Sequence, residues 1–144
     1  MQAPRGFTLI ELLVVVGIVG ILAALILAFL NDGREKSRDS ARAADIKQLQ
    51  IALSLYFDDR QLYPTALKSL APQYIPVLPN DPTTHIEYPY DRISTTKYHL
   101  GANLEQAHVN LLRSDVDATT TKVFGSDSTG CAGEVNLHCY DVNP

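Results

Sequence analysis

After a short polar leader, apolar residues run almost without interruption to position 30. From Leu12 to Leu30 there are 19 residues without a charged or strongly polar side chain. A helix rising about 1.5 Å per residue would make this segment about 28 Å long, close to the roughly 30 Å hydrocarbon thickness of a bilayer. We therefore expect a membrane-spanning helix over residues 7–30. The alternative is a cleavable signal peptide, whose apolar region runs to about 15 residues and ends at a small-x-small site. No Ala-x-Ala stands directly after this segment.

Beyond residue 30 the pattern becomes amphipathic. Its apolar positions recur at helical spacing, at Ile46, Leu49, Leu53 and Tyr56. No proline occurs between Pro4 and Pro64. One continuous helix over residues 7–58 is predicted, with residues 31–58 as an amphipathic continuation of the membrane segment.

Residues 59–144 carry shorter patterns that predict a globular β domain. Prolines and Asn-Asp punctuate residues 64–82, with a short helix expected over 66–71. Strands are expected at 86–90 and 97–104, and weaker candidates lie at 109–112 and 135–140. The predicted fold class is α+β, a long helix packed on a small antiparallel sheet.

Composition and motifs exclude several classes of function. Twelve Lys and Arg face 16 Asp and Glu, a net charge of -4, which argues against nucleic acid as the main partner. The chain has no Gly-x-Ser-x-Gly, His-Glu-x-x-His, P-loop or dinucleotide fingerprint. We therefore expect a protein that is not an enzyme.

Glu11 places a carboxylate inside the apolar segment. At a bilayer centre such a group costs roughly 2.5–3.5 kcal/mol, although near a helix end it could reach the interface. No Lys or Arg lies between Arg5 and Arg34, so the helix offers no positive partner. A positive partner would have to come from another molecule or from a new amino terminus. Cutting between Gly6 and Phe7 would create such an amine four residues before Glu11.

Residues 6–16, Gly-Phe-Thr-Leu-Ile-Glu followed by Leu-Leu-Val-Val-Val, resemble the processing motif of type IV prepilins and type II secretion pseudopilins. The resemblance implies that residues 1–6 are a leader that prepilin peptidase removes after Gly6. It implies that Phe7 becomes the methylated amino terminus. Glu11 would be the carboxylate needed for assembly, paired with the terminal amine of a neighbouring subunit.

The resemblance also implies partners and a location. Expected partners are copies of this chain and other pilins in a filament, prepilin peptidase, an inner-membrane assembly platform, and lipid before assembly. The chain would cross the bacterial inner membrane once, with an extracytoplasmic carboxyl-terminal domain and a periplasmic or cell-surface filament. The positive-inside rule conflicts with this topology, because most basic residues near the segment follow it; the cleavage motif is the more specific signal.

Three functional alternatives remain at this point. Two lie within the family, namely a type II secretion pseudopilin and a surface pilus subunit. The third is a monomeric, helix-anchored extracytoplasmic binding module, which would keep its leader.

Three arginines recur every fourth residue after the apolar segment, at Arg34, Arg38 and Arg42. Like charges at this spacing repel mildly, and acidic residues three positions away can offset them, as in Asp39–Arg42 and Arg42–Asp45. The arginines predict either a solvated helix face or contact with acidic groups of adjacent subunits or lipid head groups.

Cys131 and Cys139 lie eight positions apart near the carboxyl end. In an exported domain we expect a disulfide, which would contribute roughly 2–3 kcal/mol by closing a short loop; a cytoplasmic domain would keep the pair reduced. Zinc ligation with His108 or His138 is disfavoured, because no paired ligand spacing supports it.

Asp115, Asp117 and Asp127 form a polar stretch near the carboxyl end. Resemblance to major pseudopilins implies a calcium-binding loop near the carboxyl end, but the resemblance does not assign its ligands to particular residues of this chain. The spacing of the three aspartates is not that of an EF-hand. The favoured interpretation is a solvated loop, with no cofactor and no metal.

Overall fold

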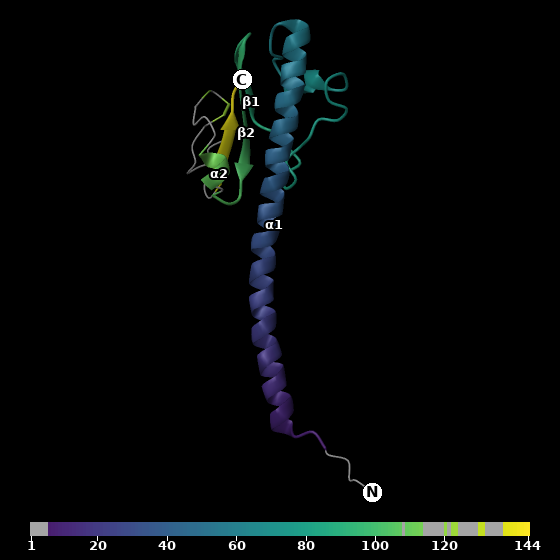
Figure 1. Ribbon diagram of the computed structural model, residues 1–144, viewed down its shortest axis with the longest axis vertical. Helices are drawn as coiled ribbons and strands as arrows, with labels where there is room; N and C mark the ends of the chain where they lie inside the picture. The colour runs from purple at the N-terminus through teal and green to yellow at the C-terminus, as the bar shows by residue number, and fades with distance from the viewer. Residues whose placement is uncertain (1–5, 108, 114–119, 121, 124–129, 132–136) are drawn as a thin grey trace. The chain divides into compact units, whose positions relative to one another are not determined.

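The computed structural model describes residues 6–107, 109–113, 120, 122–123, 130–131 and 137–144. The chain forms two compact units, Met1–Arg34 and Glu35–Pro144, of which the second holds the globular fold. Its regular elements, in chain order, are α1 (Leu9–Arg60), a short 3-10 helix (Leu67–Leu70), β1 (Tyr90–Ser94), β2 (Lys97–Leu104), α2 (Val109–Leu112) and β3 (His138–Val142) (Figure 1).

α1 is one helix of 52 residues, which confirms the continuous helix predicted over 7–58 and displaces it by two residues at each end. Its carboxyl end is set by Gln61, whose backbone enters the left-handed region with φ 57°. The Gln61 N–H donates to the Phe57 carbonyl at 2.7 Å, as in an αL helix cap. The short helix predicted over 66–71 is present as the 3-10 turn Leu67–Leu70.

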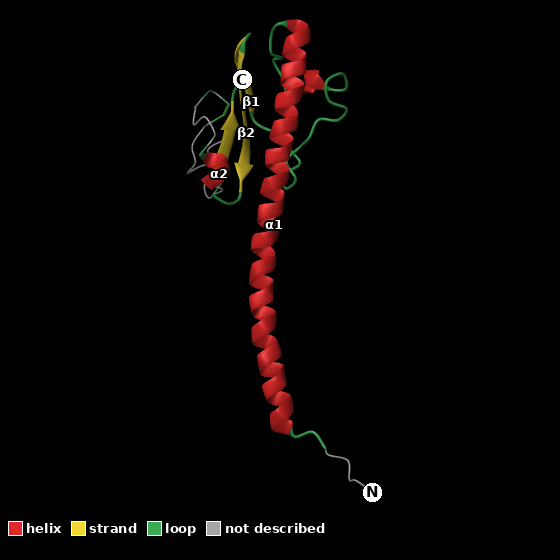
Figure 2. Ribbon diagram, in the orientation of Figure 1, coloured by secondary structure: helices red, strands yellow, loops and turns green. Residues whose placement is uncertain are grey.

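The three strands form one antiparallel sheet in the order β1-β2-β3. Strands are drawn in yellow in Figure 2. Leu100 at the centre of β2 pairs with Tyr90 of β1 and with Val142 of β3. A register shift between Asp91 and Ser94 bends the edge strand β1. The predicted α+β class is therefore confirmed, and β2 covers the residues expected for it.

The core of the second unit lies between this sheet and the amphipathic half of α1. Ile46, Leu49 and Leu53 of α1 are fully buried, as the helical spacing predicted. The alternate residues of β2 share one face and join the same cluster, at Tyr98, Leu100, Ala102 and Leu104. Each large aliphatic side chain buried here stabilises the fold by roughly 1.5–3 kcal/mol relative to exposure.

The other face of β2 is also covered. Gly101 lies against the Cys131–Cys139 disulfide and Val123, which form a second small cluster. A Cβ at Gly101 would stand 2.7 Å from Cys131 Sγ and 3.1 Å from Val123 Cγ1. A larger side chain at position 101 would therefore push the disulfide layer away from the sheet.

Three strand predictions were wrong in position or type. The first strand begins at Tyr90 instead of ending there, and within 86–90 only Glu87 makes an isolated bridge, to Asn80. Pro89 has no N–H for a ladder, and the edge strand that follows is half exposed, so it lacks the apolar signal of a buried strand.

Residues 109–112, predicted as a strand, form the helix α2. A run of four mostly apolar residues is too short for its periodicity to distinguish the two structures. The last strand, predicted over 135–140, is observed at His138–Val142. Residues 135 and 136 lie outside the described part of the chain.

Candidate functional site

The amino end of α1 is closed by a reciprocal pair of side-chain hydrogen bonds. The Glu11 N–H donates to Thr8 Oγ1 at 3.3 Å. The Thr8 N–H and hydroxyl donate to Glu11 Oε2 at 3.3 and 3.2 Å. Thr8 precedes the first helical residue, so this is a capping box with Glu11 at the third helical position. The carboxylate also lies at the positive end of the helix dipole.

This capping box gives Glu11 a hydrogen-bonding partner, which a search for oppositely charged residues in the sequence did not find. The partner is neutral, so it supplies two hydrogen bonds but no compensating charge. Burial of an ionised carboxylate in apolar surroundings remains costly even when it is hydrogen-bonded. The box therefore orients Glu11 and lowers its cost, while leaving a negative charge that a cation could pair with.

The apolar side chains after Glu11 have nothing to pack against in this chain. Of the described side chains from Phe7 to Leu30, every one is exposed, including Leu13 at 65% and Ile21 at 66%. By length and composition α1 contains a stretch apolar enough to cross a membrane, and none of that stretch is buried. An apolar surface of this extent requires lipid or other protein to cover it.

The bond between Gly6 and Phe7 precedes this helix in an exposed, non-helical stretch. A Cβ at Gly6 would meet no atom within 4 Å, and the Gly6 φ lies outside the left-handed range. Neither space nor backbone conformation in the described chain therefore requires a glycine at position 6.

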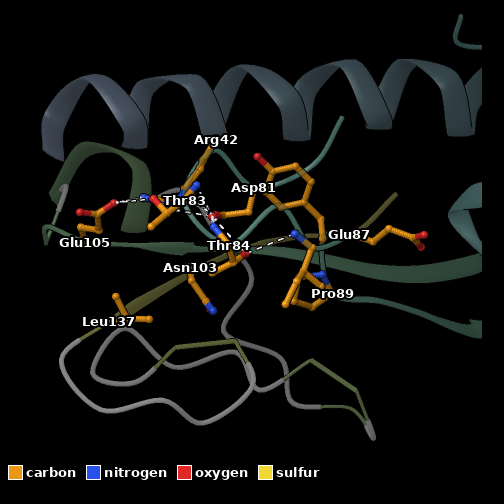
Figure 3. A pocket seen from close by; sticks show the side chains of 11 residues that line it. Arg42, Asp81, Thr83, Thr84, Glu87, Pro89, Asn103, Glu105 and Leu137 are labelled. Carbon is orange, nitrogen blue, oxygen red and sulfur yellow. Dashed lines mark hydrogen bonds and ion pairs between the residues drawn. The ribbon is translucent and has the colours of Figure 1, made fainter. Parts of the chain in front are cut away.

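A second polar site lies within the globular unit, around Arg42. We call it the Arg42 cluster, and it consists of Arg38, Asp39, Arg42, Asp81, Thr83 and Glu105. The buried Arg42 guanidinium contacts Asp39 at 2.7 Å, Asp81 at 2.6 Å and Glu105 at 2.8 Å. It also donates to Thr83 Oγ1 at 2.8 Å (Figure 3). One side chain of α1 thus holds the loop at residues 81–84 and the end of β2.

The charges in this cluster stabilise one another. Burial alone would lower the pKa of Arg42, but hydrogen bonds to three carboxylates raise it above its ordinary value. Burial alone would raise the pKa of Asp81, but Arg42 and two backbone N–H groups lower it to about 2. A hydrogen bond from Arg38 is the main reason that the pKa of Glu105 falls to about 2. Arg42, Asp81 and Glu105 are therefore ionised at neutral pH.

Comparison with known proteins connects the amino-terminal site to a family. Residues 1–27 match the model described as the prokaryotic N-terminal methylation motif. A type II secretion system core protein G from Aeromonas hydrophila is 35% identical over 117 residues, which cover 68% of this chain and 80% of that protein. The chain belongs to the type II secretion system core protein G family.

Other members of the core protein G family are similar over shorter stretches. The proteins from Klebsiella michiganensis and Escherichia coli are 38% and 41% identical over 90 and 66 residues. Those matches span 62% and 46% of the two relatives, less than two thirds of their length. No solved structure matches the chain.

Membership of the core protein G family confirms the resemblance seen at residues 6–16. These relatives are named for type II secretion and not for a surface pilus.

Both interpretations of the arginine repeat were wrong for Arg42. Its side chain is buried and neither solvated nor available to another subunit or lipid. Arg38 is partly exposed and pairs with Glu105 of the same chain. The expected Asp39–Arg42 pair forms, whereas Asp45 accepts a hydrogen bond from the Tyr88 hydroxyl at 2.7 Å.

The expected disulfide between Cys131 and Cys139 is present. Both sulfurs are therefore committed to each other and are not zinc ligands. No group of three or more His, Cys, Asp or Glu in the described residues is arranged to hold a metal. Asp115, Asp117 and Asp127, considered for calcium, lie outside the described residues, and so does His108.

One functional signal in the sequence was missed. Thr8-Leu9-Ile10-Glu11 has the Thr-x-x-Glu spacing of a capping box directly before an apolar run. That pattern predicts both the start of α1 and a local partner for Glu11. The Arg42 cluster had no comparable signal, since Asp81 and Glu105 are 39 and 63 positions from Arg42.

Proposed function

We propose that this chain is a structural, non-catalytic subunit of a pilin-like filament that serves type II secretion. Its α1 surface would be covered by lipid before assembly and by the helices of neighbouring subunits in the filament core afterwards. The single observation that carries the proposal is the exposed apolar surface of α1. This surface begins immediately after the Gly6–Phe7 bond, and the Thr8–Glu11 capping box lies at its amino end.

Processing would occur between Gly6 and Phe7. The bond is exposed and lies ahead of the first helical turn, where a peptidase can bind an extended chain. The glycine has no role within the described chain, which supports recognition by another protein. Prepilin peptidase would remove residues 1–6 and methylate Phe7.

Glu11 would then guide assembly. The capping box holds its carboxylate at the amino end of α1 while leaving its charge uncompensated. The amine of a neighbouring Phe7 supplies the missing positive charge in surroundings of low dielectric constant, where the attraction is strong. Pairing would set the axial register between subunits.

The proposed location is the bacterial inner membrane, with a single span and the globular unit outside the cytoplasm. The disulfide supports this side of the membrane, because such bonds persist in oxidising compartments. Partners would be copies of this chain, other pilins, the peptidase and an inner-membrane assembly platform.

Mass spectrometry of the mature amino terminus tests the proposal. Protein purified from bacteria that carry the secretion system should begin at an N-methylated Phe7, and Gly6→Leu should leave residues 1–6 attached. A wild-type protein that keeps Met1 while folded and membrane-bound would contradict the proposal and favour the monomeric, helix-anchored binding module.

A further inference from the structure

The side of α1 that faces away from the core carries exposed apolar residues within the globular unit. Ile51 is 62% exposed and Leu55 is 48% exposed. They lie four residues apart and so share one helix face, whereas Leu49 and Leu53 point to the core from the opposite side. An open hollow of about 480 Å³ lies over this face, lined by Ile51, Leu55, Lys47, Gln50 and Ser54. We call it the outer helix face.

A second surface of the same unit is also hollow and largely apolar. A cavity of about 620 Å³ lies between the 81–89 loop and β2. Arg42 lies on its side nearest α1, and Pro89 and Leu137 lie on the side away from that helix (Figure 3). Ile86, which is 67% exposed, completes its apolar lining. We call it the loop cavity.

The two surfaces both expose apolar side chains, and they also carry charges of opposite sign. Lys47 is the charged residue lining the hollow of the outer helix face. Of the three carboxylates that line the loop cavity, Asp81 and Glu105 are paired with Arg42 and Arg38 of the same chain, so Glu87 is the one that faces a docking partner. Glu87 is bound by Lys68 at 3.0 Å, but the Lys68 side chain is largely exposed and that of Glu87 is half-buried, so the pair is weak and exchangeable.

The surfaces lie on different sides of one unit, so a single copy cannot join its own two surfaces. We propose that the outer helix face of one copy docks into the loop cavity of the next copy, with Ile51 and Leu55 against Ile86 and Lys47 against Glu87. Contacts between different faces are heterologous and extend into open polymers unless the rotation closes a ring. This inference rests on the proposed filament and adds the contact between its globular units.

Cysteine crosslinking in assembled filaments tests this contact. The native cysteines are both in the disulfide, so introduced cysteines supply the free thiols. The full chain carrying Ile51→Cys and Ile86→Cys should give a ladder of covalent multimers with a short bismaleimide. The matched control carries Ile51→Cys and Ile93→Cys, because Ile93 is 55% exposed but does not line the loop cavity. The control should give no ladder.

Charge reversal provides a second measurement if the cysteine variants assemble poorly. Lys47→Glu and Glu87→Lys should each lower sedimentable filament about threefold, and the double variant should restore it. Lys97→Glu, at an exposed position that lines neither surface, should leave assembly unchanged.

The outcomes separate this contact from the filament itself. The contact would be overturned if wild-type filaments form but the Ile51–Ile86 variant gives no ladder, if the Ile93 control gives an equal ladder, or if the crosslinks join a different protein. It would also be overturned if the Lys47→Glu, Glu87→Lys double variant did not restore assembly. Each of these outcomes would leave the proposed filament unaffected. Absence of wild-type filaments would overturn both proposals.

Discussion

At the scale of single residues, Arg42 shows how one side chain organises a fold. It is buried and contacts three carboxylates, two of which come from segments far along the chain. Desolvating these charges is costly, so the cluster adds less net stability than its contacts suggest. Removing either partner of such a pair is strongly destabilising, because it leaves a buried charge uncompensated.

The Arg42 cluster predicts a loss of stability in acid. The pKa values of Asp81 and Glu105 are depressed to about 2 from ordinary values of 3.8 and 4.5. Their contribution is complete above the unfolded values and is lost as pH falls through the folded ones. The free energy of unfolding, measured by denaturant titration, should decline by roughly 1–3 kcal/mol between about pH 5 and pH 2 from these two groups.

Arg42→Gln should reduce that dependence by the part that Asp81 contributes, whereas Glu105 keeps its pair with Arg38. It should lower stability by about 3–5 kcal/mol at neutral pH, because it leaves the Asp81 carboxylate without its cation. Arg60→Gln is the matched control, since Arg60 makes an exposed pair with Asp59 and its loss should change stability by less than about 1 kcal/mol. An unchanged acid profile in Arg42→Gln would contradict this role.

At the scale of elements, the two halves of α1 differ in what their apolar side chains pack against. Its first half is exposed and apolar, whereas its second half buries Ile46, Leu49 and Leu53 against the sheet. Its ends are set locally, by the Thr8–Glu11 box and by the left-handed Gln61. Only the second half depends on tertiary contacts within one chain. Under the proposed function, the first half is therefore the part that would exchange lipid for neighbouring helices.

The capping box predicts different effects for Thr8 and Glu11. Glu11→Ala should insert into the membrane and be cleaved, yet assemble poorly, because both the cap and the charge are lost. Thr8→Val should weaken the helix start by about 1 kcal/mol and reduce assembly less, whereas Thr8→Ser should behave as wild type. The measurements are the mature amino terminus and the amount of sedimentable filament. Normal filament incorporation of Glu11→Ala would contradict the assembly role.

At the scale of the whole molecule, the two compact units differ in what holds them together. All of the buried core of the described residues belongs to the second unit, Glu35–Pro144, and so does the disulfide. The first unit buries none of its described side chains. The globular unit therefore carries its own stability, while the apolar half of α1 is stabilised by whatever covers it.

This division predicts that residues 35–144 fold alone. The fragment should be soluble without detergent, retain the Cys131–Cys139 bond and unfold in one cooperative thermal transition close to that of the full chain in micelles. Thermal unfolding followed by circular dichroism, with free-thiol titration, measures this. A fragment without near-ultraviolet signal or cooperativity would show that the first half of α1 is needed for the fold.

The sequence by itself determined the features that depend on neighbouring residues. The apolar run, the helical spacing of Ile46, Leu49 and Leu53, and the span of β2 follow from patterns repeated over a few positions. Tertiary structure decided the burial of Arg42, the need for glycine at position 101 and the true limits of β1. Each of these depends on segments distant along the chain, as Arg42 and Asp81 are 39 positions apart and Gly101 meets Cys131 only after β2 and the disulfide layer have packed. Local patterns report which side of an element is apolar, but not which distant charge or atom will lie against it.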